Sequence, residues 1–297
     1  MIAGRITPKW IWTGMVLNLG LWLMLHLPAY LGLIPHYLQA EGGLRTAALS
    51  IAYALALVLN LEVAREYLNA PWLRLAWLAL AGNAVFSIVR MIIESTLLLH
   101  IYPGYPGSPL AGLLQHLAIV PANAFLLLGL LSMLWAYHQL GLGFTIKWRD
   151  YLAIAGIFAL LAALLWFRQG LSEARSPFVA ARILQQSGLV MLSFAAAVSL
   201  ILDRIANQMG GGKLALTLRF LTLYTLMRGV LVLMQALFRL MSPGLNDPLS
   251  LVSMVLDICW QAVPWFAALA AAYRAEMTQH AARELAQHRA SRAAMAS

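Results

Sequence analysis

Apolar stretches of 18 or more residues recur along this chain, from close to its first residue as far as Tyr273. Each stretch is long enough to cross the hydrocarbon layer of a membrane as an α-helix. Inside that layer every backbone N–H and C=O must be bonded, and a helix bonds its own. A membrane β-barrel would instead alternate polar and apolar residues over short segments. The sequence therefore predicts an all-α fold, a polytopic integral membrane helical bundle.

The composition agrees with a membrane protein. Of 297 residues, 62% are hydrophobic and 10% are charged, whereas about a quarter of the residues in soluble domains are charged. The formal net charge of +9 fits Lys and Arg side chains that face anionic head groups at the membrane edges. We therefore expect the lipid bilayer as a partner, and no nucleic acid.

Turn and linker residues divide the chain into about eight spans. The predicted helices are Trp10–Leu33, Leu44–Leu61, Pro71–His100, Pro109–Tyr137, Tyr151–Phe167, Phe178–Leu202, Leu214–Met241 and Pro248–Tyr273. The first is longer than the apolar core of a signal peptide, and no clear cleavage site follows it, so we expect it to be retained. Most of the 20 Lys and Arg residues fall at one set of span ends. Because basic residues stay in the cytoplasm, we expect a plasma (inner) membrane protein with cytoplasmic N- and C-termini.

The domain prediction has two parts. Residues 1–273 form the transmembrane bundle, and residues 274–297 form a cytoplasmic, basic, helical tail. Arg90 and Arg228 precede similar Pro/Gly turns, which suggests two repeats, 10–140 and 150–273, arranged as a 4+4 parallel repeat. In the tail, Met277, Ala281 and Leu285 make a thin apolar stripe. This stripe predicts contact with a cytoplasmic or membrane protein partner, and the alternative is a solvated tail near anionic lipid.

Ionisable residues inside the predicted spans are the leading functional candidates, because burying a charge in hydrocarbon is costly. Arg90 and Glu94 lie one helical turn apart, and Arg228 and Asp257 are placed to meet across the last hairpin. Arginines in a polar cavity would bind a small anionic or lipid-like ligand through bidentate hydrogen bonds. Alternatively, the charges form internal ion pairs that fix helix register. The candidate ligand-binding residues are Arg90, Glu94, His116, Arg228, Asp257 and Gln261.

A cofactor-binding site is the second interpretation of the same region. His26 and His116, on the first and fourth predicted helices, would hold a haem b if those helices are neighbours, and Glu94 would add a metal ligand. A hydrogen-bonded structural histidine is the simpler interpretation. We therefore expect no cofactor, and we keep His26 and His116 as the haem or metal candidates.

The chain lacks the motifs of common catalytic sites: we find no HExxH, GxSxG, CxxC or nucleotide-binding Gly-rich loop. We therefore expect no enzyme. The first hypothesis is a non-enzymatic ligand-binding module, receptor-like or coupled to a partner, that passes a ligand-induced change through its last helix. The alternatives are a solute or lipid transporter and a haem- or quinone-binding electron-transfer subunit. An absorption spectrum and an uptake assay separate the three.

Overall fold

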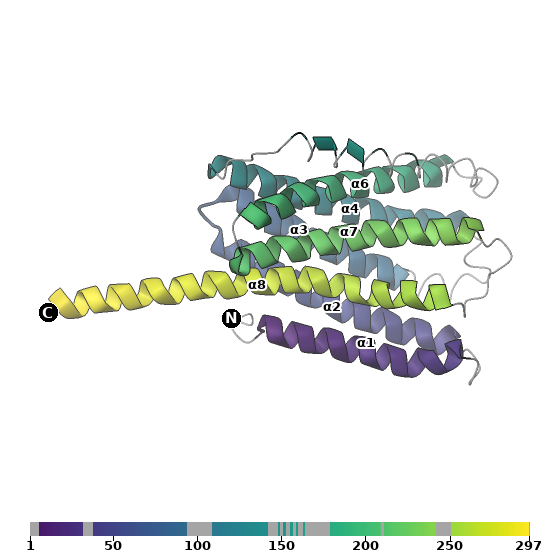
Figure 1. The fold of residues 1–297 in the computed structure, drawn as a ribbon, viewed down its shortest axis with the longest axis horizontal. Coiled ribbons are helices and arrows are strands. Elements are labelled where there is room, and N and C mark those ends of the chain that lie inside the picture. Colours follow the sequence, from purple (N-terminus) through teal and green to yellow (C-terminus); the bar gives the residue numbers. More distant parts are fainter. Residues whose placement is uncertain are drawn as a thin grey trace.

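The computed structural model describes residues 6–31, 38–93, 109–141, 148, 151–152, 155–156, 159, 163, 179–208, 211–241 and 251–296. Its elements there are helices, and they follow the predicted order (Figure 1). The helices are α1 (Pro8–Tyr30), α2 (Leu38–Glu66), α3 (Pro71–Ile92), α4 (Pro109–Gln139), α6 (Val179–Gln208), α7 (Gly212–Met241) and α8 (Leu251–Ala296).

All seven of these helices are long and apolar enough to cross a membrane. A multi-pass helical membrane bundle is therefore the architecture of the described part of the chain. The predicted span Tyr151–Phe167 lies mostly outside the described residues, so the count of eight stays a prediction. So does the division into repeats 10–140 and 150–273.

Helix boundaries follow local chemistry. α3 begins at Pro71, as predicted, because proline's fixed φ suits the first helical position and its missing N–H costs nothing there. α2 continues past the expected Leu61 through Glu62, Arg65 and Glu66. α8 runs on without a break from the apolar span into the tail, because Ala, Glu, Gln and Arg all favour helix.

Six helices close into a ring. Going round it, α2 packs on α3, α3 on α4, α4 on α6, α6 on α7, α7 on α8, and α8 again on α2. α1 lies outside the ring, and its main contact is with α8. The expectation that the first and fourth helices are neighbours is therefore wrong. The first four helices do not form a closed unit of their own, because α8 closes the ring against α2 and holds α1 on its outer side.

The direction of each helix follows from paired side chains. Trp72 at the start of α3 lies edge-on to Trp135 near the end of α4, with ring centroids 6.3 Å apart. α3 and α4 are therefore antiparallel. One end of the bundle carries Gly211 and the turn at residues 67–70. We call it the turn end. α3 starts there and α4 finishes there.

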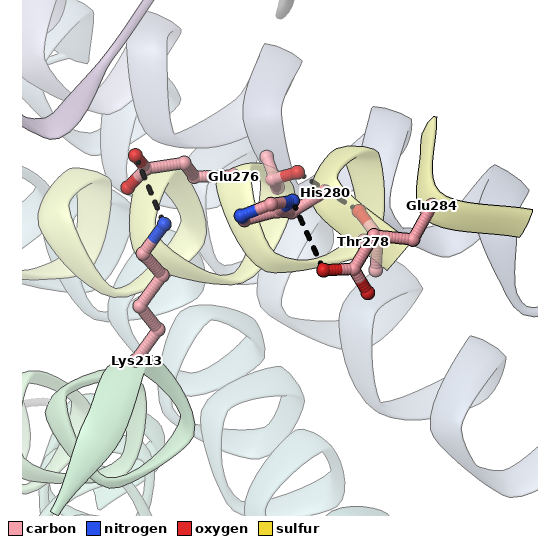
Figure 2. A network of polar contacts seen from close by, with 6 residues as sticks. Lys213, Glu276, Thr278, His280 and Glu284 are labelled. Carbon is pink, nitrogen blue, oxygen red and sulfur yellow. Dashed lines mark hydrogen bonds and ion pairs between the residues drawn. The ribbon is translucent and has the colours of Figure 1, made fainter. Parts of the chain in front are cut away.

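α7 also starts at the turn end. Lys213 in its first turn pairs with Glu276 of α8 at 3.1 Å (Figure 2). Two residues before Glu276, the Arg274 guanidinium lies 5.1 Å from the centroid of the Tyr67 ring, in the turn that precedes α3. α3 and α7 are thus parallel, and α8 is antiparallel to both. Beyond the turn end α8 projects clear of the other helices (Figure 1).

Candidate functional site

A buried hydrogen-bond network crosses the middle of the ring. The Asn83 amide nitrogen on α3 donates to the Ala122 carbonyl on α4 at 2.7 Å. The Tyr224 hydroxyl on α7 donates to the Asn83 carbonyl oxygen at 2.7 Å. α3 and α7 are not neighbours around the ring, so this second bond spans its interior. It joins opposite sides of the bundle at one level.

Arg228 extends the network by one helical turn, away from the turn end. Its Nη1 donates to the Tyr224 hydroxyl at 2.9 Å, and the arginine is only 3% exposed. Tyr53 of α2 also interacts with the Tyr224 hydroxyl. Three helices, α2, α3 and α7, thus converge on one phenol. The arginine that sequence reasoning singled out is bonded to Tyr224, which it did not single out, and Tyr53 contacts the same tyrosine.

Ser87 lies at the level of Arg228. Because α3 and α7 run in the same direction and Asn83 meets Tyr224, the residues four positions later on each helix share a level. Ser87 also shares the face of α3 that carries Asn83. Its hydroxyl is buried, and among the described residues it has no hydrogen-bond partner. A buried hydroxyl without a partner is unfavourable, so this position suits a hydrogen bond to a bound group.

The side chains around Arg228 and Ser87 favour a hydrogen-bond acceptor as ligand. A guanidinium has five N–H donors and keeps its positive charge, and the described contact of Arg228 uses one of them. We call Arg228, Ser87, Tyr224 and Asn83 the central layer. Its chemistry is that of a site for an anionic or carbonyl oxygen.

The other ionisable candidates from the sequence either already have interactions within the protein or lie outside the described residues. Arg90 and His116 are partly buried, and both already have interactions within the protein, as does Asp257. The ion pair of Arg228 with Asp257 stays a prediction, because the acceptor described for Arg228 is the Tyr224 hydroxyl. Glu94 lies outside the described residues. The role of Arg90, Glu94, His116 and Asp257 in ligand binding therefore stays a prediction.

Gln261 lies on the face of α8 that carries Trp265. It is four residues before Trp265, so the two share a face, and Trp265 packs against Gly14 of α1, where an added Cβ would come within 2.8 Å of the indole. Gln261 is fully buried at 0% exposure. Neither atom of its amide group has a partner among the described residues. The structure thus places Gln261 toward the contact of α8 with α1.

The histidine pair of the haem hypothesis is on helices that are not neighbours. His26 is buried on α1, with Nδ1 2.8 Å from the Trp22 carbonyl oxygen and its ring stacked on Trp22 at 4.4 Å. His116 is on α4, which packs between α3 and α6. Within the described ranges no group of three or more His, Cys, Asp or Glu side chains is placed to hold a metal ion. The expectation of no cofactor, and the haem alternative, therefore stay predictions.

Sequence reasoning missed the uncharged members of the central layer. Asn83, Tyr224 and Ser87 are ordinary residues in membrane helices when each is taken alone, and so is Tyr53, which contacts Tyr224. One signal was available: Asn83 is an amide within a long apolar segment, and such side chains hydrogen-bond across helices. The hydrogen-bond partner of Asn83 could not be predicted from the sequence, because Tyr224 lies 141 residues away. No family model, no curated protein and no solved structure matches this chain.

Proposed function

We propose that this chain is a non-enzymatic ligand-binding module of the membrane, receptor-like or coupled to a partner protein. The central layer is its site, and the ligand is a small anion or a polar lipid-like molecule. The observation that carries the proposal is a buried guanidinium, that of Arg228, whose described hydrogen-bond partner is a neutral phenol. A cation in a low-dielectric interior is strongly stabilised by a negative partner, and a ligand oxygen would supply one.

The donor geometry supports an oxygen-rich ligand. Arg228 and Ser87 sit at one level on parallel helices, so one carboxylate or phosphate group would accept hydrogen bonds from both. Tyr224 and Asn83 would hold the arginine in place, so that ordering it costs less on binding. A planar guanidinium binds such groups through two parallel bonds, whereas a lysine ammonium acts as a point charge.

Helix α8 is the proposed route of coupling. It is one of the six helices of the ring over its apolar length, and it continues beyond the turn end as one helix to Ala296. A change in the ring that tilts α8 would therefore move its projecting part. We propose that this part is cytoplasmic and meets a cytoplasmic or membrane partner there. Cytoplasmic termini and a place in the inner membrane belong to the same proposal, with eight crossings.

A thermal-shift screen of small carboxylates, phosphates and lipids tests the binding proposal. We expect at least one compound to raise the Tm of the wild type, and Arg228→Lys to fold but lose most of that shift. Arg219→Lys is the matched control, because Arg219 is an exposed arginine on the same helix that bonds Asn207 at 2.9 Å. Equal shifts in wild type and Arg228→Lys, or no stabilising compound at all, would remove the central layer as the site.

A transporter is the alternative, and the ring order favours it. If residues 10–140 and 150–273 are repeats, α2, α3 and α4 correspond to α6, α7 and α8. The observed order α2–α3–α4–α6–α7–α8 is the order that a two-fold axis along the membrane normal would produce, as in parallel-repeat transporters. Uptake of a stabilising compound into proteoliposomes would favour the transporter, and binding without uptake would favour the ligand-binding module.

A further inference from the structure

A second set of buried polar groups lies in the seam between α1 and α8, outside the ring. Gly14 of α1 lets the Trp265 indole of α8 approach closely. The two helices run in opposite directions (Figure 1), so moving one turn away from the turn end leads from Gly14 to Asn18 and from Trp265 to Gln261. Asn18 and Gln261 therefore face the same level of the seam.

The polar atoms at this level lack partners. The Asn18 amide nitrogen, both Gln261 amide atoms and the Trp265 indole nitrogen are buried and have no hydrogen-bond partner among the described residues. Gln261 is 0% exposed and Trp265 is 4% exposed. Native proteins pair nearly all buried polar atoms with protein, water or ligand. Four such atoms on two facing helices indicate an occupant other than the described residues.

The atoms define the chemistry of that occupant. Of the four unpartnered atoms, the nitrogens of Asn18, Gln261 and Trp265 are N–H donors, and the Gln261 oxygen is an acceptor. An occupant must therefore present mainly acceptor oxygens, as a carbonyl or hydroxyl group does. Asp257 follows one turn beyond Gln261 on α8, so a second acidic group nearby would be repelled. An uncharged ligand avoids that repulsion.

Access to the seam comes from the lipid. α1 packs mainly on α8, and its outer face is apolar, with Leu17 and Met24 strongly exposed. A molecule dissolved in the hydrocarbon layer would reach the seam without entering the ring. We propose that the α1–α8 seam binds the carbonyl- or hydroxyl-bearing end of an uncharged, lipid-soluble molecule, held by Asn18, Gln261 and Trp265. This site is separate from the central layer.

Thermal shifts with four decyl probes test the proposal on the purified full chain. A decyl-substituted benzoquinone and monodecanoyl glycerol carry uncharged oxygens, decylbenzene carries none, and decanoic acid carries a charge. We expect one or both of the first two to raise the Tm of the wild type, by roughly 5 °C at about 100 times the dissociation constant. Decylbenzene and decanoic acid should raise it less. Comparing the Tm shift of the benzoquinone with that of monodecanoyl glycerol distinguishes a quinone ligand from a glycerol ester.

The variants assign the response to the seam. Gln261→Leu removes both amide atoms at similar size, so it should fold at least as well as the wild type but lose the shift. Trp265→Phe removes the N–H together with outer ring carbons that lie against Gly14, so its shift is compared with its own Tm without probe, and it provides a second test. Ser193→Ala is the control, because the Ser193 hydroxyl bonds its own helix at the Leu189 carbonyl, and its response should equal that of the wild type. Arg228→Lys should also respond, which separates this site from the central layer.

Two results would overturn the proposal. In the first, the oxygen-bearing probes stabilise the wild type no more than decylbenzene does, which would show that the seam holds no such ligand. In the second, both Gln261→Leu and Trp265→Phe respond as the wild type does, which would place the bound probe elsewhere.

Discussion

The Tyr224 hydroxyl donates to the Asn83 carbonyl oxygen across the ring at 2.7 Å. The same hydroxyl accepts the hydrogen bond from Arg228 Nη1. One tyrosine therefore connects α3 to α7 and fixes the position of the buried guanidinium. Between membrane helices, packing and polar contacts of this kind replace the hydrophobic driving force that water provides elsewhere. Tyr224 is thus central to both the stability and the site of this protein.

Tyr224→Phe should destabilise the fold. The change leaves the Asn83 oxygen and an Arg228 N–H without their partner, and a buried polar group left unpaired costs about 1–3 kcal/mol. Unfolding in mixed detergent micelles measures the loss. Tyr151→Phe is the control, because Tyr151 is 54% exposed, and it should leave the free energy of unfolding unchanged. A Tyr224→Phe protein as stable as the wild type would contradict the network.

Double-mutant cycles should identify the partner of Arg228. Combining Arg228→Gln with Tyr224→Phe should give a coupling energy of about 0.5–3 kcal/mol, as residues in one network do. The parallel cycle with Asp257→Asn tests the ion pair expected from the sequence. Additive losses for Arg228 and Tyr224, together with strong coupling of Arg228 to Asp257, would show that the arginine uses the carboxylate.

The sequence was sufficient to predict the seven described helices and their capacity to span a membrane, because apolar length and Pro/Gly turns act locally. Pro71 marks the start of α3, and the tail composition predicts that α8 continues. The order of packing was not predictable in the same way. A membrane helix is apolar on every side, so its sequence does not show which face meets a neighbour. The expected contact of the first and fourth helices was wrong for this reason.

The candidate site was predictable only in part. Arg228 stood out because a charge in hydrocarbon is conspicuous in a sequence. Tyr224 and Ser87 did not, because their importance arises from parallel helices that place them beside Asn83 and Arg228. Gln261 was included with the ionisable residues, and its spacing from Trp265 puts it on the face of α8 toward α1, so its role in ligand binding stays a prediction. Such placements depend on the rotation of each helix about its axis, which long-range contacts decide.

The close contact of α3 and α4 gives a packing prediction. A Cβ at Gly129 would lie 3.1 Å from both the Ala76 carbonyl oxygen and the Leu80 side chain, whereas a Cβ at Gly20 meets nothing within 4 Å. Gly129→Val should therefore destabilise the fold by about 1–3 kcal/mol through overpacking. Gly20→Val, the same change at an open helical position, should have little effect. Equal losses would mean that helix propensity, and not packing, is responsible.

The proposal of eight membrane crossings predicts on which side of the membrane each connection lies. α4 and α6 both finish at the turn end, so the chain between them connects opposite ends of the bundle. Reporters fused at Gly211 and at the C-terminus should therefore both report the cytoplasm, and a reporter between Ser172 and Ser176 should report the other side. A reporter at Gly211 that reads outside would contradict the proposed orientation, and one between Ser172 and Ser176 that reads inside would contradict the eighth crossing.

The most direct test of the central claim is an experimental structure of the wild type, in lipid, with the compound that stabilises it best. The proposal predicts density for that compound within hydrogen-bond distance of the Arg228 guanidinium and the Ser87 hydroxyl, with Tyr224 still bonded to Asn83. A structure in which protein side chains alone satisfy Arg228 and Ser87, with the compound bound elsewhere, would contradict it.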